Sequence, residues 1–548
     1  MAEAAAGAGV GAGAAARAGA ARMFGVETEY ALAAVTPEGK GGDRGRVLGE
    51  LMRLAGAQIP SLTGFRDGDL YLQNGSRFYV DCGAHPELST PECTNPWDIL
   101  RYIQAGERLL AGLCCQIESA GPGHGHREVA LLKCNVDYSG AKSTWGSHES
   151  YLHVADPAGL PKQLIPHLVS RIIYAGAGGF NSLSPGLEFV ISPRAPHLVA
   201  PVSDSSTSNR GIFHTKDESL SRGGYHRLHL LCGESLCSET AAWLRIGTTA
   251  LVVAMIEAGL RPGDGVDLPA PLEALRRFAA DPDLQAEVRC ADARCLTAAA
   301  IQRHYLELAE AHLARSFMPP WAPAVCQAWR ALLERIETDP RSLSRTLDWA
   351  IKLELYRERS RRRGIEPGAW PVWTEIVAAL VQALGETEFS GKPVRVEFVL
   401  GPESPISPAV ERITPILEMN SLRWDALRPF MDLRQELFEI DLRFGQIGER
   451  GIFAGLDRAG LLAHRVAGVD NIEHAMTEPP AEGRARLRGE AVRRFAGRSD
   501  FRCSWQKVWD NAEGKALDLN DPFERVEKWR KTPASERLTF HSFLRDMF

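Results

Sequence analysis

The sequence has no C-x-x-C pair, no hydrophobic run of membrane-spanning length and no strong net charge. Its eleven cysteines are scattered, and no histidine-rich stretch supplies zinc-finger spacing. An odd number of cysteines without a secretory signal is typical of reduced thiols in a cytoplasm. The most apolar stretch, Thr248–Ile256, has about half the length that crosses a bilayer. We therefore expect a soluble cytoplasmic protein that does not enter a membrane.

The charge balance is close to neutral for a chain of 548 residues. Lys and Arg number 63, Asp and Glu number 69, and the formal net charge is −6. This balance argues against a nucleic-acid partner held by bulk charge. The chain is 45% hydrophobic, so it can bury a sizeable core. Its length allows two or three domains, or one large domain with an appendage.

Residues 1–22 differ in composition from the rest of the chain, since they contain twelve alanines and five glycines. They lack a cationic stretch followed by a leucine-rich run, so they do not resemble a secretory signal. Scattered glycines weaken a helix despite the alanine content. We expect a disordered, low-complexity tail, with Met23 as an alternative start of the protein.

Polar side chains alternate with apolar ones in four predicted strands. Successive side chains of a strand point to opposite faces, so each strand gathers its polar residues on one face. These residues are Glu27 and Glu29 in the first strand, Arg77, Tyr79 and Asp81 in the second, Lys133, Asn135 and Asp137 in the third, and Arg227 and His229 in the fourth. One such strand alone would indicate a half-solvated sheet edge. Four of them indicate a shared polar face.

The carboxylates of this face need a compensating charge, because neighbouring carboxylates raise one another's pKa. A divalent cation is the usual compensation, and Mg²⁺ is commonly held by a few carboxylates together with substrate phosphates. The pattern therefore predicts a curved, mainly antiparallel sheet whose polar face holds a magnesium nucleotide. The alternative is a sheet that binds a polyanionic partner without chemistry.

Longer motifs follow one another in order along the chain. They are Gly25–Glu29, Asn74–Glu87, Pro91–Pro96, Gly146–Tyr151, Tyr225–His229, Leu244–Thr249, Arg484–Glu490 and Asp521–Phe523. This combination resembles the Pup ligase and Pup deamidase family of carboxylate–amine ligases. The resemblance implies an α+β fold with a large glutamine-synthetase-like domain, in which a mainly antiparallel sheet packs on helices, and a small C-terminal domain. We expect the large domain at 23–469 and the small one at 470–548.

The resemblance also implies ATP and Mg²⁺ as cofactors and assigns roles to individual residues. The metal positions are Glu27, Tyr79 and Glu87, with Glu29 as a further ligand, and the nucleotide contacts are Arg77, Thr90 and Trp505. Asp81 matches the catalytic base, which fits the removal of a proton from a substrate lysine. Arg227 and Lys216 are candidates for cations that neutralise phosphate, with ordinary ion pairs as the alternative.

The chain departs from the family pattern at several positions. Ser150 stands where the family has Asn, Lys216 where it has Arg, and Pro193 where it has Gln. Lys offers a point charge in place of a planar guanidinium, so these changes concern recognition of the modifier more than nucleotide binding. An insertion at about 365–430 contains a predicted helix at 370–383, a predicted strand at 393–400 and a turn at 401–405. It either contacts a partner or decorates the surface.

The implied activity is formation of an isopeptide bond between the C-terminal Glu of a Pup-like modifier and a lysine of a protein substrate, which marks that substrate for proteasomal degradation. The opening Gly25–Glu29 and the closing Asp521–Arg525 resemble the ligase branch, whereas Pro91–Pro96 and Arg210–Ile212 resemble the deamidase. Two alternatives therefore stay open. The same site could deamidate or remove the modifier, or the protein could be an adaptor with reduced catalysis.

Overall fold

The computed structural model describes residues 21–65, 68–81, 83–119, 126–205, 209–218, 220–384 and 407–532. Most of the alanine-rich tail, the predicted strand at 393–400 and the turn at 401–405 lie outside the described residues. The predicted helix of the insertion is confirmed as α11 (Trp370–Leu384).

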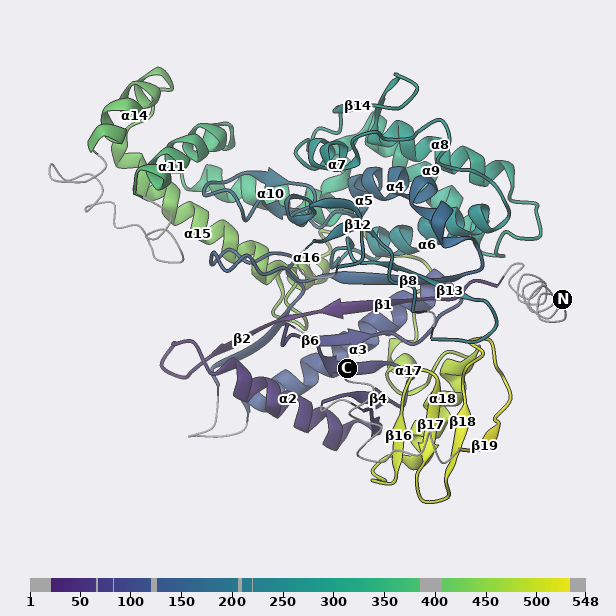
Figure 1. Cartoon of the computed structure of the whole chain (residues 1–548). Helices are drawn as coiled ribbons and strands as arrows, with labels where there is room; N and C mark the ends of the chain where they lie inside the picture. Colours follow the sequence, from purple (N-terminus) through teal and green to yellow (C-terminus); the bar gives the residue numbers. More distant parts are fainter. Residues whose placement is uncertain are drawn as a thin grey trace.

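A nine-stranded sheet forms the centre of the molecule (Figure 1). In spatial order its strands are β11 (Ala200–Ser203), β12 (Gly211–His214), β13 (His226–Leu230), β8 (Ser147–His153), β1 (Phe24–Glu29), β6 (Pro86–Ser89), β5 (Arg77–Val80), β4 (Leu70–Leu72) and β3 (Ser61–Thr63). All neighbours pair antiparallel except β11 and β12, which pair parallel. The predicted mainly antiparallel sheet is therefore confirmed.

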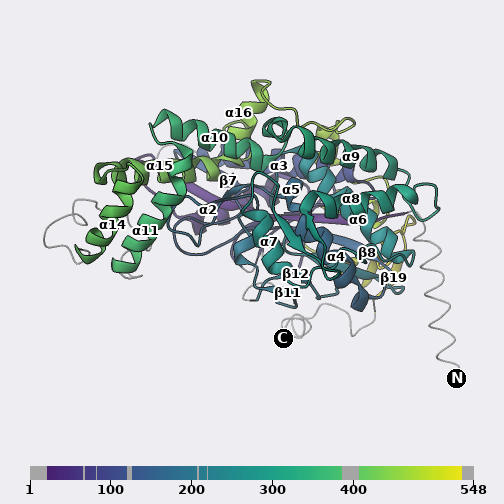
Figure 2. The same cartoon turned by 90° about the horizontal axis from the view of Figure 1, so that it is seen from above.

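Some helices pack against the large sheet, and others pack on those helices or lie at one end of the molecule. The longer ones are α2 (Arg44–Gln58), α3 (Pro96–Glu118), α4 (Leu160–Ser170), α6 (Glu239–Glu257), α7 (Pro271–Ala279), α8 (Ala298–Ala311), α9 (Ala322–Thr338), α10 (Asp348–Arg362), α14 (Ser407–Met419) and α15 (Leu427–Phe444). Phe24 and Val26 of β1 belong to one buried cluster with Ile99 of α3 and Leu244 of α6. Figures 1 and 2 show α11, α14 and α15 together at one end of the molecule.

Two helices illustrate how local sequence sets these elements. Asn95 caps α3, since its side chain accepts a hydrogen bond from the backbone N–H of Asp98, and Pro96 occupies the first turn. Helix α6 is long and apolar enough to cross a membrane, but 89% of its most apolar window is buried inside the protein. It is a central core helix of the fold.

The C-terminal part of the chain adds a small sheet. Helices α17 (Ile472–Thr477) and α18 (Arg484–Phe495) precede four antiparallel strands, β16 (Phe501–Cys503), β17 (Lys507–Asp510), β18 (Lys515–Asp518) and β19 (Trp529–Lys531). Leu487 and Val492 of α18 pack with Val508 and Leu517 of this sheet. Leu62 of β3 joins the same cluster, so the small sheet covers one edge of the large one.

The third predicted strand is wrong beyond its first residue. Strand β7 (Glu128–Leu132) pairs with β2 (Ala31–Val35) in a separate two-stranded sheet, and the chain leaves it after Leu132. Lys133 and Asn135 donate hydrogen bonds to the backbone carbonyls of Leu236 and Ser235, at 2.9 and 3.3 Å. These polar side chains therefore link the loop after β7 to the loop at 235–236 by hydrogen bonds, and they do not belong to the polar face of the large sheet.

Candidate active site

The register of the large sheet brings the predicted acidic residues together. Glu29 on β1 lies opposite Glu87 on β6, and Tyr79 on β5 lies opposite the same Glu87. On its other side, β1 pairs with β8 so that Glu27 lies opposite His148. The four residues predicted as metal ligands thus occupy three neighbouring strands.

His148 lies among the three carboxylates. Its Nδ1 atom is 3.6 Å from Glu27 Oε2 and 3.8 Å from Glu87 Oε1, and its Nε2 atom is 3.8 Å from Glu29 Oε1. His229 Nε2 approaches Glu27 Oε2 at 3.4 Å from β13. A side-chain cluster of three glutamates and two histidines therefore occupies the middle of the polar face.

The pKa values of the acidic groups in this cluster are shifted in opposite directions. Burial would raise the pKa of Glu27, but Arg227 and the two histidines hold that pKa well below its usual range. Burial raises the pKa of Glu87, and the negative charges of Glu27 and Glu29 raise it further. The pKa of Glu87 is therefore well above its usual range. The pKa of Tyr79 is raised as well, by burial and by the charges of Glu27 and Glu87. The cluster holds more negative charge than its cations balance.

These residues fit a divalent cation. Glu87 Oε1 is buried and has no hydrogen-bond partner among the described residues, and groups drawn from Glu27, Glu29, Glu87, His148 and His229 lie close enough to share an ion. Carboxylate oxygens are the donors that Mg²⁺ prefers. Imidazole nitrogens suit softer ions such as Mn²⁺ or Zn²⁺ better, so the donor set alone does not single out one metal.

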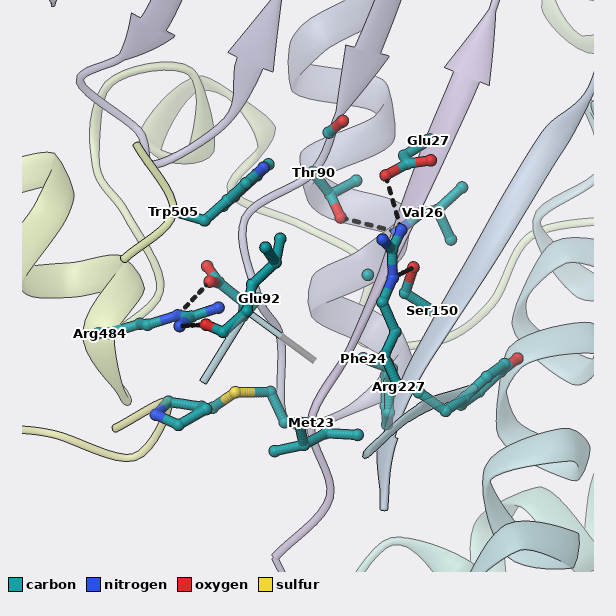
Figure 3. Close-up of a pocket in the computed structure, with 16 residues that line it drawn as sticks. Met23, Phe24, Val26, Glu27, Thr90, Glu92, Ser150, Arg227, Arg484 and Trp505 are labelled. Carbon is teal, nitrogen blue, oxygen red and sulfur yellow. Dashed lines mark hydrogen bonds and ion pairs between the residues drawn. The ribbon is translucent and has the colours of Figure 1, made fainter. Parts of the chain in front are cut away.

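A pocket adjoins this cluster between the large sheet and the C-terminal part (Figure 3). Glu27 and Thr90 line it from the sheet, and Arg484 and Trp505 line it from the C-terminal part. Thr90 Oγ1 accepts a hydrogen bond of 3.1 Å from the backbone N–H of Val26, which fixes the hydroxyl at the wall. Two of the three predicted nucleotide contacts, Thr90 and Trp505, thus line one pocket.

Arg77, the third predicted nucleotide contact, does not line this pocket but lies on the same sheet face. It forms an ion pair of 2.7 Å with Asp69, and its guanidinium lies 3.9 Å from the ring centroid of Tyr79 and 5.7 Å from that of Tyr71. Burial would lower the pKa of Arg77, but Tyr71, Asp69 and Tyr79 raise it above its usual value. Its Nε atom is buried without a hydrogen-bond partner among the described residues.

Of the predicted catalytic residues, Arg227 and Asp81 lie at the cluster. Arg227 donates hydrogen bonds of 3.0 Å to both Glu27 and Ser150, so the serine that departs from the family pattern holds this guanidinium (Figure 3). Asp81 follows β5, and one of its oxygens lies within 4.8 Å of a Glu29 oxygen.

Lys216 is not brought to the cluster. Its side chain is 56% exposed and pairs with Glu218 at 2.9 Å, beyond the end of β12. The alternative of an ordinary surface ion pair describes what the structure shows, and a catalytic role for Lys216 stays a prediction.

The two histidines of the cluster were not predicted as site residues from the sequence. His229 was placed beside Arg227 on a polar strand face, and His148 belongs to a recognised motif. The missing information was the strand order, because only the pairing of β8 and β13 beside β1 brings both rings to Glu27.

Comparison with known proteins identifies the family. The family model described as Pup-ligase protein matches residues 22–373 and 421–509. The chain belongs to the Pup ligase family. It is 31% identical over 522 residues to the Pup–protein ligase of Acidimicrobium ferrooxidans, which covers 93% of this chain and 98% of that relative. It is 35% identical over 359 residues to the Pup–protein ligase of Xylanimonas cellulosilytica, which covers 63% and 76%. The resemblance of the motifs to the Pup ligase family is thus confirmed.

Solved structures share the fold of this Pup ligase family member. The complex between the prokaryotic ubiquitin-like protein Pup and its ligase PafA aligns with a TM-score of 0.68 and 24% identity, over 92% of this chain and 90% of that one. PafA in complex with ADP aligns with a TM-score of 0.62 and 24% identity, over 88% and 92%. At this identity the alignments show the fold, and the glutamine-synthetase-like class predicted from the sequence is confirmed. The family model leaves 374–420 unmatched, within the predicted insertion.

Proposed function

We propose that this protein is an ATP-dependent ligase that joins the C-terminal glutamate of a Pup-like modifier to a lysine of a protein substrate. The observation that carries the proposal is the carboxylate cluster beside the pocket of Thr90 and Trp505, in a chain that belongs to the Pup ligase family. The curated relatives compared above are named Pup–protein ligases, and one structural neighbour contains ADP.

The chemistry follows from the poor reactivity of a carboxylate toward an amine. Transfer of the γ-phosphoryl group of ATP to the glutamate gives an acyl phosphate with a good leaving group. The lysine amine then attacks the acyl carbon, a C–N bond forms and phosphate leaves. We propose that Asp81 accepts the proton that the lysine must lose, because Asp81 is a half-buried carboxylate beside Glu29. Arg227 supplies positive charge next to Glu27.

Mg²⁺ is the proposed metal, and Glu27, Glu29, Glu87 and Tyr79 would hold it. When bound, it would neutralise charge on the transferring phosphoryl group. Titration with Mn²⁺, monitored by electron paramagnetic resonance in the absence of nucleotide, tests the ligand set. We expect Glu87→Gln to weaken Mn²⁺ binding at least about tenfold, because metal sites depend on each carboxylate ligand. Unchanged binding by this variant would remove Glu87 from the site.

Stacking of the nucleotide base on Trp505 is the proposed role of that residue, and Thr90 would contact the nucleotide from the opposite wall of the pocket. The segment from about residue 470 onward would then be a small domain that closes the nucleotide pocket. Cytoplasmic location is also proposed, in keeping with the dispersed free cysteines.

Parallel reactions with a Glu peptide, a Gln peptide and a preformed conjugate separate the proposed ligase from its alternatives. The protein is incubated with ATP, a lysine acceptor and a Pup-like peptide that ends in Glu or in Gln. Conjugate and ADP from the Glu peptide support the ligase. Ammonia from the Gln peptide, or free modifier released from a conjugate without net ATP use, would instead identify a hydrolase. Nucleotide binding without turnover would identify an adaptor.

Asp81→Asn tests the assignment of the base within the same assay. We expect conjugation to slow by about 10²-fold or more, which is the usual contribution of a general base. Hydroxylamine provides the control because it is uncharged at neutral pH and needs no base to attack an acyl phosphate. Conjugation to lysine at the wild-type rate by Asp81→Asn would show that the base lies elsewhere.

A further inference from the structure

The loop between β5 and β6 holds the Asp81 carboxylate on two sides. His85 donates its backbone N–H to Asp81 Oδ1 at 2.6 Å, and His85 Nδ1 lies 3.2 Å from Asp81 Oδ2. Asp81 also donates its backbone N–H to the His85 carbonyl at 3.0 Å across a tight turn, in which Ala84 adopts a φ of 58°. One residue therefore contacts both oxygens of the carboxylate.

The surroundings of His85 restrict its ring to this position. The ring packs against Trp145, with ring centroids 5.4 Å apart. On the other side, Gly83 leaves no room for a side chain, since a Cβ atom there would lie 2.7 Å from His85 Cε1 and 3.2 Å from Asp81 Oδ2. The absence of a side chain at position 83 is thus what lets the imidazole lie against the carboxylate.

We propose that His85 is a positioning residue for the ligation step, which orients the Asp81 carboxylate toward the amine of the substrate lysine. This proposal rests on the proposed function, in which Asp81 accepts the lysine proton. With Nδ1–H donated to Oδ2 and the backbone N–H donated to Oδ1, the carboxylate cannot rotate about its Cβ–Cγ bond without losing a hydrogen bond. The remaining lone pairs of the carboxylate are then held in one direction, in a carboxylate that lies within 4.8 Å of a Glu29 oxygen.

The role of His85 is specific to one half of the reaction. Formation of the acyl phosphate moves no proton from the amine, so it does not depend on the direction of Asp81. In aminolysis the ammonium group first gives one proton to Asp81. The free amine then forms the C–N bond as the C–O bond to phosphate breaks, and the second proton lost from nitrogen leaves with the released phosphate. A misdirected carboxylate should therefore slow aminolysis alone, because catalytic proton transfer requires hydrogen-bond geometry.

Three variants of the full-length protein test the proposal. His85→Asn keeps a donor nitrogen at the place of Nδ1, whereas His85→Gln moves that donor to the place of Nε2 and His85→Leu removes it. We expect conjugation of a lysine acceptor to fall about 10- to 100-fold in His85→Leu and His85→Gln, and His85→Asn to restore it to within about threefold of wild type. The KM for ATP should stay unchanged in all three.

Gly83→Ala perturbs the same contact without changing either partner. Its Cβ would displace the His85 ring, and we expect a loss of conjugation similar to that of His85→Leu. Gly112→Ala is the matched control, because a Cβ atom at position 112 of α3 meets nothing within 4 Å. This control should conjugate at the wild-type rate.

Hydroxylamine trapping separates this proposal from the proposed function. Wild type and all His85 variants should form hydroxamate from the Pup-like peptide at equal rates, because this nucleophile needs no base. Equal conjugation of lysine by His85→Leu and wild type would overturn the positioning role, as would a variant whose Mg²⁺ requirement rises, which would make His85 a metal ligand. If wild type forms neither hydroxamate nor conjugate, it is the proposed function that fails.

Discussion

A buried ion-pair network joins the C-terminal part to the segment that follows β6 of the large sheet, and Glu92→Gln should disrupt it. Glu92 follows β6 and lines the pocket of Thr90 and Trp505. It accepts a hydrogen bond of 2.6 Å from Arg484 and is also paired with Arg488, whose side chain is 0% exposed. Arg488 in turn lies 4.5 Å from the ring centroid of Trp505. The substituted amide keeps the shape of Glu92 but leaves two buried guanidinium groups without a counter-charge.

The loss of stability in Glu92→Gln can be estimated in two ways. Burial would raise the pKa of Glu92, but Arg488 and Arg484 lower it to about 2. Compared with about 4.3 for an ordinary glutamate, that shift corresponds to about 3 kcal/mol at neutral pH. Independently, removal of one partner from a buried ion pair typically costs about 3–5 kcal/mol. We therefore expect Glu92→Gln to destabilise the junction by about 3 kcal/mol or more.

The sign of the pH dependence follows from the lowered pKa. The ionised form of Glu92 is favoured by the folded state, so its contribution is complete above pH about 4.3 and is lost as the pH falls toward 2. The difference in stability between wild type and Glu92→Gln should accordingly be constant near neutral pH and shrink below pH about 4.

Urea unfolding followed by tryptophan fluorescence measures this effect, since Trp505 lies at the junction. Glu490→Gln is the matched control on α18, the helix that carries Arg484 and Arg488, because Glu490 is 40% exposed and pairs with Arg486 in an ordinary i,i+4 arrangement. This control should lose less than about 1 kcal/mol. A loss in Glu92→Gln no greater than in Glu490→Gln would refute the reasoning.

Three further substitutions probe the core, the carboxylate cluster and the surface beside it. Asp441 is 3% exposed and accepts hydrogen bonds from Lys352 and two tyrosine hydroxyls. Asp441→Asn should therefore lower the free energy of unfolding, measured by thermal unfolding, by about 3–5 kcal/mol. A loss below about 1 kcal/mol would contradict this. Arg227→Lys replaces a guanidinium that bridges two residues by a point charge, and we expect kcat for conjugation to fall at least about tenfold. Lys216→Ala, outside the cluster, should stay within about twofold of wild type, whereas a larger loss would restore its catalytic assignment.

The sequence predicts the strands of the site well because their alternation is regular. Glu27 and Glu29 share one face of β1, and Phe24 and Val26 on the opposite face join the core. The same rule failed after Leu132, since alternation continues there while the chain has left the strand. Lys133 satisfies its charge against Glu107 and a loop carbonyl, and such a tertiary contact has no signature within a short window.

The junction of Glu92 with α18 lies beyond sequence reasoning for another reason. Glu92 and Arg488 are separated by 396 residues, and each sits in a motif that gives no hint of its partner. The family resemblance supplies the order of the motifs but not the contacts between them. The structure shows that the two motifs meet at the wall of the pocket, where Trp505 is held.

The position of the junction explains how a strained charge cluster and a stable fold coexist. Glu27, Glu29 and Glu87 repel one another across two neighbouring strands, and Glu87 lacks a hydrogen-bond partner for one buried oxygen among the described residues. Glu92, a few residues further along the chain, has the opposite balance, because two guanidinium groups surround one carboxylate. The strand that carries Glu87, in the cluster with excess negative charge, is thus followed directly by Glu92, which Arg484 and Arg488 bind by ion pairs. An acidic site open to a cation therefore persists in the sheet because the neighbouring ion pairs hold the strand ends and the pocket wall in place.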